Sequence, residues 1–136
     1  MLTRLLLAVF LLAHAGIHAG FLSPQPQATA GGPQWPFDLS RSWILTPLRV
    51  PRELTRLLGM ALVGTTVGAF VLAAVATVGL LPAGIWAPAV AVGVVASASL
   101  LILFFHRWLI FGFIIDTGLL WAVLVAGWTP QATAAP

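Results

Sequence analysis

The sequence predicts an all-α integral membrane protein: a four-helix bundle that forms a single membrane domain over residues 1–136. Hydrophobic residues make up 60% of the chain and charged residues only 7%, with a mean hydropathy of +1.06. A soluble domain carries roughly a quarter of its residues charged, so most of this chain has lipid as its solvent. The apolar residues are also concentrated in four long runs, at about 2–22, 54–81, 87–105 and 108–127. Each run can cross a bilayer core of ~30 Å once, because that takes ~20 helical residues.

The first run, residues 2–22, begins like a secretory signal peptide. Arg4 precedes an apolar stretch, and small residues flank His14 as they would a cleavage site. Cleavage would place the arginine-rich linker outside the cell and would remove the histidines from the remaining helices. We therefore expect this run to stay as the first membrane helix, and a cleaved signal peptide is the alternative.

The linker, residues 23–53, starts as a segment of Pro, Gln, Ala and Gly that is too poor in apolar residues to fold alone. Asp38 can then cap a short helix in which Leu39 and Trp43 share a face, and such a helix would lie on the membrane surface as an interfacial segment. A simple ordered loop is the alternative. Pro51 favours the first turn of the second helix.

The last three runs are joined by connections of only a few residues, so successive helices must be antiparallel neighbours. We expect the first helix to close the bundle against the fourth. Five of the six tryptophans lie at run ends or in the linker, as in an aromatic belt at the headgroup level, and only Trp121 lies within a run. The five are Trp35, Trp43, Trp86, Trp108 and Trp128.

Arginine supplies all six basic residues and predicts the orientation. In a four-span chain five of them fall on one side, namely Arg41, Arg49, Arg52, Arg56 and Arg107, against Arg4 on the other. The positive-inside rule then places the linker in the cytoplasm and both termini outside, in an inner (plasma) membrane. Six scattered cations form no nucleic-acid surface. The absence of cysteine excludes disulfides, thiolate metal sites and thiol redox chemistry.

Asp116 is the only acid within the four runs, and His14 and His18 are its predicted partners. The two histidines are four residues apart, so they share a helix face. At ~1.5 Å per residue, His14 lies about 12 Å from the end of the first run and Asp116 about 13 Å from Arg107, on the same side of the membrane. A lone carboxylate at mid-membrane costs on the order of 3 kcal/mol. We therefore predict a direct His14 to Asp116 hydrogen bond, in a neutral or proton-sharing pair.

Three interpretations of this intramembrane polar cluster are open: a structural lock between helices, a path for protons or cations, and a metal or haem site. Two imidazoles and a carboxylate could bind a divalent cation, but the H-x-x-x-H spacing lacks the catalytic Glu of a metalloprotease. His106 lies at the membrane edge, too far to complete a bis-histidine haem site. We expect no cofactor and no metal.

Small residues recur every four positions and predict close helix packing. The first helix carries Gly16 and Gly20, and the second carries Gly64 and Gly68. The third carries Ala89, Gly93 and Ser97. Gly112 lies one turn before Asp116 and predicts a close contact between the first and fourth helices.

Two of these segments resemble a known group. His14-Ala-Gly-Ile-His18-Ala-Gly-Phe21 resembles the H-G-L-I-H-L-x-G-F signature, an H-x-x-I-H motif, that ends helix one in a family of small bacterial four-helix membrane proteins of uncharacterised function. Phe111-Gly112-Phe-Ile-Ile-Asp116 resembles that group's F-G-T-I-x-N segment, and Arg56-Leu-Leu-Gly resembles the start of its second helix. The group more often carries Asn at the place of Asp116, and its linker is shorter. The resemblance implies the fold and the polar cluster, and it implies no activity.

The sequence thus predicts a multi-pass membrane protein whose partners are the lipid bilayer and a homo-oligomer or larger membrane complex, without nucleic acid. The leading functional expectation is a non-enzymatic subunit or accessory component with a structural His/Asp cluster. The alternative is a small proton- or cation-coupled transporter that uses His14, His18 and Asp116. A membrane enzyme ranks third, because no substrate pocket is visible in the sequence.

Overall fold

A computed structural model of the protein describes residues 1–24 and 36–130. The described part is all-helical and contains no strand. Its four long helices are α1 (Leu2–Ala19), α2 (Arg52–Thr77), α3 (Trp86–Leu103) and α4 (Ile110–Leu124). Short 3-10 turns extend or precede them: η1 (Gly20–Leu22), η2 (Ala83–Ile85) and η3 (Arg107–Leu109). All four helical segments are long and apolar enough to cross a membrane, which confirms the predicted all-α class with four candidate membrane spans.

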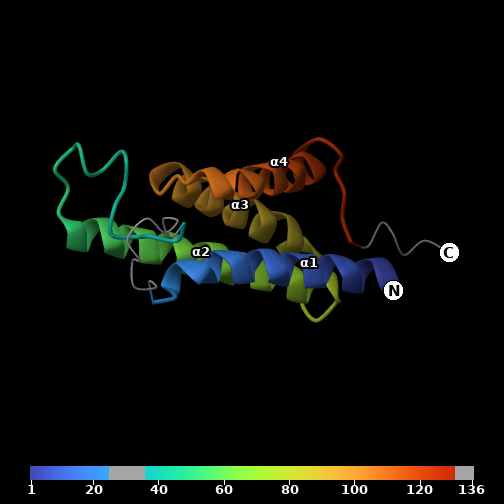
Figure 1. Ribbon diagram of the computed structural model, residues 1–136. Helices are drawn as coiled ribbons and strands as arrows, with labels where there is room; N and C mark the ends of the chain where they lie inside the picture. Colours follow the sequence, from blue (N-terminus) through green and yellow to red (C-terminus); the bar gives the residue numbers. More distant parts are fainter. Residues whose placement is uncertain (25–35, 131–136) are drawn as a thin grey trace.

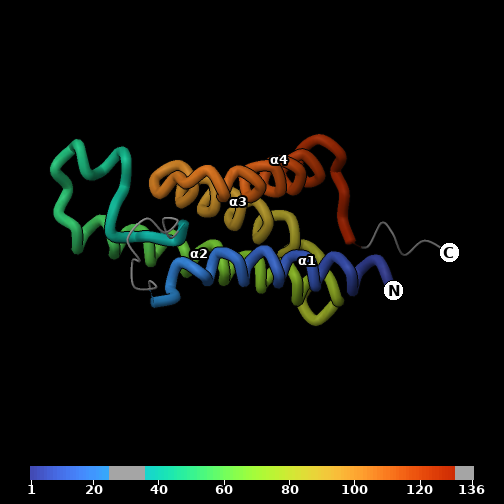
Figure 2. The backbone as a smooth tube through the Cα atoms, in the orientation of Figure 1, coloured from blue at the N-terminus to red at the C-terminus, as the bar shows by residue number. Residues whose placement is uncertain are grey.

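The helices pack in chain order, α1 along α2, α2 along α3 and α3 along α4 (Figure 1). The backbone trace shows the same sequence of neighbours, with tight connections after α2 and α3 (Figure 2). The predicted hairpin series is therefore confirmed. The backbones of α1 and α4 make no comparable approach. The expectation of a tight α1 to α4 packing contact was wrong, because α1 packs mainly against α2.

All four α-helices end before their apolar runs do, and a glycine with positive φ follows two of them, α2 and α4. Gly79 has φ of +87°, beyond the last residue of α2, and the Leu80 N–H donates to the Val75 carbonyl. Gly127 has φ of +56° beyond α4. The left-handed conformation costs glycine little and turns the chain out of the helix axis. The apolar character continues past both points, which is why run length overestimated the helices.

The described part of the linker is an ordered loop of turns, and the predicted interfacial helix is wrong. Asp38 does not cap a helix, since its Oδ1 accepts from the Ser40 N–H at 2.7 Å and closes a local turn. Leu39 is buried and Trp43 is exposed, so the two do not share a face. Leu39 instead packs into the core beside Gly59.

This loop closes the C-terminal end of α3. The Ser42 hydroxyl donates to the Leu103 carbonyl at 2.6 Å, and the Trp43 indole N–H donates to the Ile102 carbonyl at 2.6 Å. The last carbonyls of a helix have no partner within the helix. Two linker side chains therefore satisfy the end of α3 and hold the loop against it.

The tryptophans only partly form the predicted belt. Trp43, in the linker loop, and Trp108, in the turn between α3 and α4, are exposed as a belt requires. Trp86 is buried in the bundle, and its ring meets that of the partly buried Trp128 edge to face at 5.2 Å. Trp121, the one tryptophan within a run, is exposed on α4. Trp35 lies outside the described residues.

Most of the predicted packing glycines make no helix contact. A Cβ atom added at Gly16, Gly64 or Gly68 would meet no other atom within 4 Å, and all three are exposed. The prediction that these three glycines pack against another helix of this chain was wrong. Gly20 faces the Phe37 ring of the linker. The packing glycine on the predicted stripe of α3 is Gly93, where a Cβ would lie 2.9 Å from Phe70 of α2.

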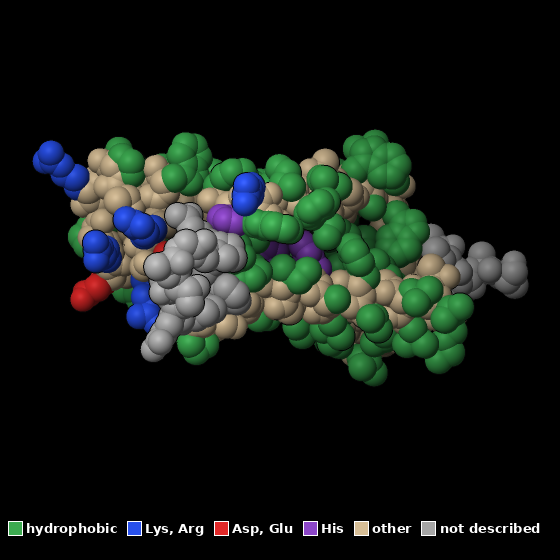
Figure 3. Space-filling model, viewed as in Figure 1, with side chains coloured by type: hydrophobic (Ala, Val, Ile, Leu, Met, Phe, Trp, Pro, Cys, Tyr) green, Lys and Arg blue, Asp and Glu red, His purple; other side chains and the backbone are tan. Residues whose placement is uncertain are grey.

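The two ends of the bundle differ in charge. The Arg4 Nε–H donates to the Pro130 carbonyl at 3.1 Å, so the start and the end of the described chain meet at one end. The other arginines gather toward the opposite end, over the linker and the α3 to α4 connection (Figure 3). In a chain with four spans, both termini lie on one side of the membrane and the linker on the other, so this unequal distribution of arginines is the asymmetry that the positive-inside rule uses.

Candidate functional site

The polar cluster is built on the inward face of α1. His14 and His18 are each 2% exposed and lie one turn apart, as their spacing of four predicts. Their rings meet edge to face with centroids 4.8 Å apart, and the His14 ring also meets Phe70 of α2 at 4.9 Å. Packing against rings on both sides fixes the orientation of His14, so that its Nε2 points across the bundle.

Asp116 of α4 is the acceptor at the centre of the cluster. The structure places His14 Nε2 3.0 Å from Asp116 Oδ1, the contact predicted from their matched depths. The second carboxylate oxygen, Oδ2, accepts from the Ser97 hydroxyl of α3 at 2.5 Å. Asp116 is 2% exposed, so both of its oxygens are satisfied by protein groups rather than by water.

Ser97 joins His18 to the same network. Its Oγ lies 2.9 Å from His18 Nε2, and the residue is fully buried. Four side chains from three helices thus form one continuous chain of hydrogen bonds, His14 to Asp116 to Ser97 to His18, which we call the polar network. All three sequence-predicted members belong to it.

The sequence reading missed the polar role of Ser97 and gave it only a packing role. The signal was present: Ser97 lies about 12 Å from Phe105 at the end of the third run, the same depth as His14 and Asp116. Ser99, two residues on, instead donates to the Val95 carbonyl of its own helix. Depth alone does not separate the two serines, because only the rotation of α3 directs Ser97 inward.

The directions of the hydrogen bonds follow from counting protons. A serine hydroxyl has one hydrogen, and Ser97 gives it to Asp116. The bond between Ser97 and His18 must therefore use the hydrogen on His18 Nε2. A neutral His18 then carries no hydrogen on Nδ1, which is a bare acceptor. This Nδ1 atom is buried and has no partner in the described structure.

A pocket of about 240 Å³ lies beside the network, between α1 and α4. Histidine atoms show at its floor in the space-filling view, between apolar side chains of the two helices (Figure 3). His14 and His18 supply the polar part of its wall, while Asp116 is not among its lining residues. The remaining wall is apolar and is contributed by Ile17, Phe21, Leu101, Trp108, Leu109, Phe111, Gly112 and Ile115.

Gly112 has a different role from the one predicted. It lines the pocket, and a Cβ at this position would lie 2.8 Å from Leu101 Cδ1 of α3. The missing side chain therefore lets α4 approach α3 and keeps the pocket open, rather than bringing α4 onto α1.

The two histidines and Asp116 are also residue types that could bind a metal ion. His14, His18 and Asp116 each offer one ligand atom, and these atoms lie within 4.8 Å of one another. Two atoms that bind one zinc ion, each at ~2.1 Å from it, are at most ~4.2 Å apart. Two ligand atoms that lie near 4.8 Å from each other would therefore have to move closer together before both could bind the ion. Binding would also displace the bonds that His14 and Ser97 make to the carboxylate.

Comparison with known proteins finds no relative that carries this site. No protein-family model matches the chain, and no curated protein or solved structure matches it significantly.

Proposed function

We propose that this protein is a non-enzymatic multi-pass component of an inner (plasma) membrane assembly, in which the polar network fixes α1 against α3 and α4. The observation that carries the proposal is the closure of the network. Every bonding oxygen and Nε2 atom in it has a protein partner, and its members come from three helices. Such a network specifies helix rotation and depth, because only one register lets all four side chains meet.

The free energy of these hydrogen bonds is small, so the network is better suited to fixing the position of α1 than to stabilising the whole fold. Interhelical hydrogen bonds in membranes average ~0.6 kcal/mol and reach ~1.7 kcal/mol. A buried partner left unsatisfied costs about 1–3 kcal/mol. The network therefore contributes modestly when complete, and it opposes any arrangement of α1 that leaves Asp116 alone in lipid.

The same residue types occur in a hydrolase triad, but their order differs. In a triad the histidine accepts the serine proton and the carboxylate holds the far side of that histidine. Here Ser97 gives its proton to Asp116, and His18 donates to Ser97. Ser97 is fully buried and does not line the pocket, so a substrate has no path to its oxygen. This arrangement favours a non-enzymatic role.

A proton-coupled transporter is the second candidate, and one observation favours it. The polar network is a continuous chain of proton donors and acceptors, and its two histidines reach the pocket. Buried ionisable chains of this kind mark proton relays in membrane proteins.

Asp116→Asn separates the two candidates. Asparagine keeps an acceptor for Ser97 but removes the ionisable group. We expect the purified variant to retain most of its thermal stability, and we expect wild type and variant to give the same background proton and cation flux in proteoliposomes. A wild-type flux that Asp116→Asn abolishes, with stability retained, would establish transport and contradict the proposal.

The assembly itself is tested by isolation in mild detergent. A tagged wild-type chain should travel as a homo-oligomer or with another membrane protein at fixed stoichiometry. A chain that is monomeric and without a partner, in detergent and again after reconstitution into lipid, would contradict the component role.

A further inference from the structure

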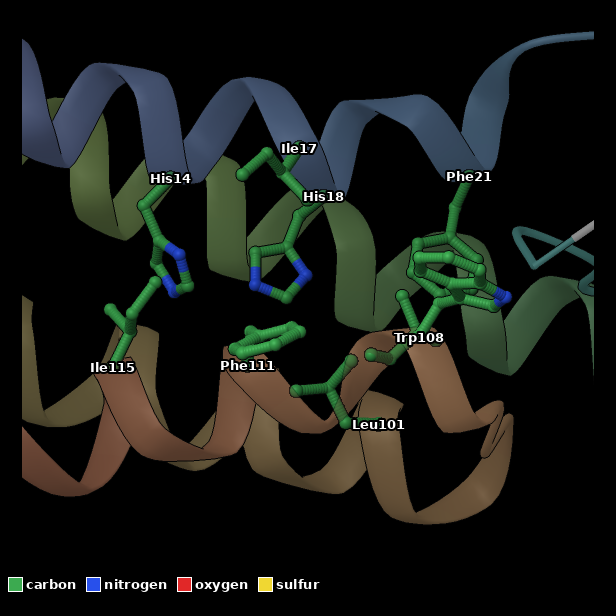
Figure 4. Close-up of a pocket in the computed structure, with 10 residues that line it drawn as sticks. His14, Ile17, His18, Phe21, Leu101, Trp108, Phe111 and Ile115 are labelled. Atoms are coloured by element: carbon green, nitrogen blue, oxygen red, sulfur yellow. The ribbon is translucent and has the colours of Figure 1, made fainter.

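Both histidines of the polar network have a buried Nδ1 atom without a partner, and the proton count above makes the Nδ1 of His18 an acceptor. His18 is 2% exposed, its Nε2 donates to Ser97, and its Nδ1 has no partner. Figure 4 shows a ring nitrogen of His18 directed toward the end of the pocket formed by Phe21, Leu101 and Trp108. A buried acceptor without a partner is unusual, and a ligand that donates a hydrogen would satisfy it.

The shape of the pocket indicates a ring. A cavity of ~150 Å³ lined by apolar side chains binds benzene, so a pocket of about 240 Å³ has room for a substituted six-membered ring. Phe21, Trp108 and Phe111 place three aromatic side chains in its wall. Aromatic rings bind one another in stacked or edge-to-face arrangements, which favours a planar aromatic head over an aliphatic one.

The pocket opens on the outer surface of the bundle, where lipid would surround the helices. Ile17, Trp108 and Phe111 line the pocket and are 52%, 65% and 66% exposed, on a part of the surface that lipid would cover. His18 lies only about 6 Å along the helix from Leu22, near the membrane interface. A head that needs a polar partner can therefore bind at His18 while an apolar tail extends into the bilayer.

We propose that this pocket binds a membrane-dissolved hydroquinone: an aromatic ring whose hydroxyl donates to His18 Nδ1 and whose apolar tail leaves between α1 and α4. The hydroxyl is required because the proton count makes Nδ1 an acceptor. Water and metal ions fit less well, since the only side chains in the pocket wall with polar atoms are the two histidines and the Trp108 indole, whose N–H cannot bind a metal. The inference concerns the pocket and does not depend on the assembly role proposed above.

Three decyl-substituted probes of nearly equal shape test it on the wild-type protein. They are a hydroquinone kept reduced with dithionite, the corresponding quinone, and the dimethyl ether of the hydroquinone. Dithionite is compatible with a chain that has no cysteine. We expect the hydroquinone to raise the thermal unfolding temperature saturably, and the other two probes to bind about tenfold or more weakly, because each lacks the hydrogen that one buried bond requires.

His18→Gln is the matched variant. A glutamine amide can place an N–H near the position of His18 Nε2 and so keep the bond to Ser97, but it has no atom equivalent to Nδ1. We expect this variant to keep its fold and to lose the preference for the hydroquinone. His106→Gln changes a histidine outside the pocket and should bind as wild type does.

Equal binding of all three probes would overturn the proposal, and so would the absence of any saturable shift. Unchanged hydroquinone preference in a folded His18→Gln protein would do the same. Tighter binding of decanoic acid than of the hydroquinone would show that a carboxylic acid, not an aromatic hydroxyl, is the ligand. If His18→Gln does not fold, the comparison of the three probes on wild type decides alone.

Discussion

His14 Nε2 lies 3.0 Å from Asp116 Oδ1, a contact that joins the first helix to the last across 102 positions of the chain. The backbones of these helices do not pack closely, and a pocket lies between them. The hydrogen bond therefore bridges an opening rather than a tight interface. This geometry explains how a buried polar pair and a cavity occur side by side at the same depth.

The close approach of α2 and α3 depends on Gly93. We predict that Gly93→Ala lowers the free energy of unfolding by about 1–3 kcal/mol, because the new Cβ would lie 2.9 Å from the Phe70 ring. Gly68→Ala is the matched control on α2. Apart from its own stretch of helix, no atom lies within 4 Å of the added Cβ, and alanine favours a helix, so stability should stay or rise. Equal effects of the two changes, measured by unfolding in detergent, would contradict the packing assignment.

The Ser42 hydroxyl makes three hydrogen bonds in the linker loop. It donates to the Leu103 carbonyl and accepts from the N–H groups of Ile44 and Leu45. We predict that Ser42→Ala costs about 1–3 kcal/mol, since it leaves the end of α3 with an unsatisfied carbonyl. The exposed Ser40 is the control, and Ser40→Ala should change stability by less than ~0.5 kcal/mol. Hydrogen exchange at the end of α3 should rise only in the Ser42 variant.

The orientation in the membrane is tested with single cysteines. Ser23 and Thr129 are both exposed, near opposite ends of the bundle, and the chain has no native cysteine. From the five-to-one arginine distribution we predict that an impermeant thiol reagent labels Thr129→Cys in intact cells and leaves Ser23→Cys unlabelled until the cells are opened. The reverse pattern would place the linker outside.

The sequence was sufficient for what depends on depth and length. Run length predicted four spans, and counting residues from the run ends brought His14 and Asp116 to one level. Both quantities follow from the rise of the helix, which hardly varies.

The sequence did not predict which side of each helix faces the interior of the bundle. Gly64 and Gly68 face outward because Val63 and Phe70 occupy the buried side of α2. Trp86 is buried for the same kind of reason, since its side of α3 meets Trp128. In a chain this apolar, inward and outward faces have nearly the same composition, so periodicity does not distinguish them.

The central claim, that His14 and Asp116 hold helices α1 and α4 together through direct contact, is tested most directly by a double-mutant cycle. The free energy of unfolding is measured for wild type, His14→Ala, Asp116→Ala and the double variant. We predict that each single change destabilises the protein, and that the double change costs less than the sum by about 0.5–2 kcal/mol, because the second change removes a partner already left alone. Strict additivity of the two single effects would show that the residues do not interact and would contradict the account.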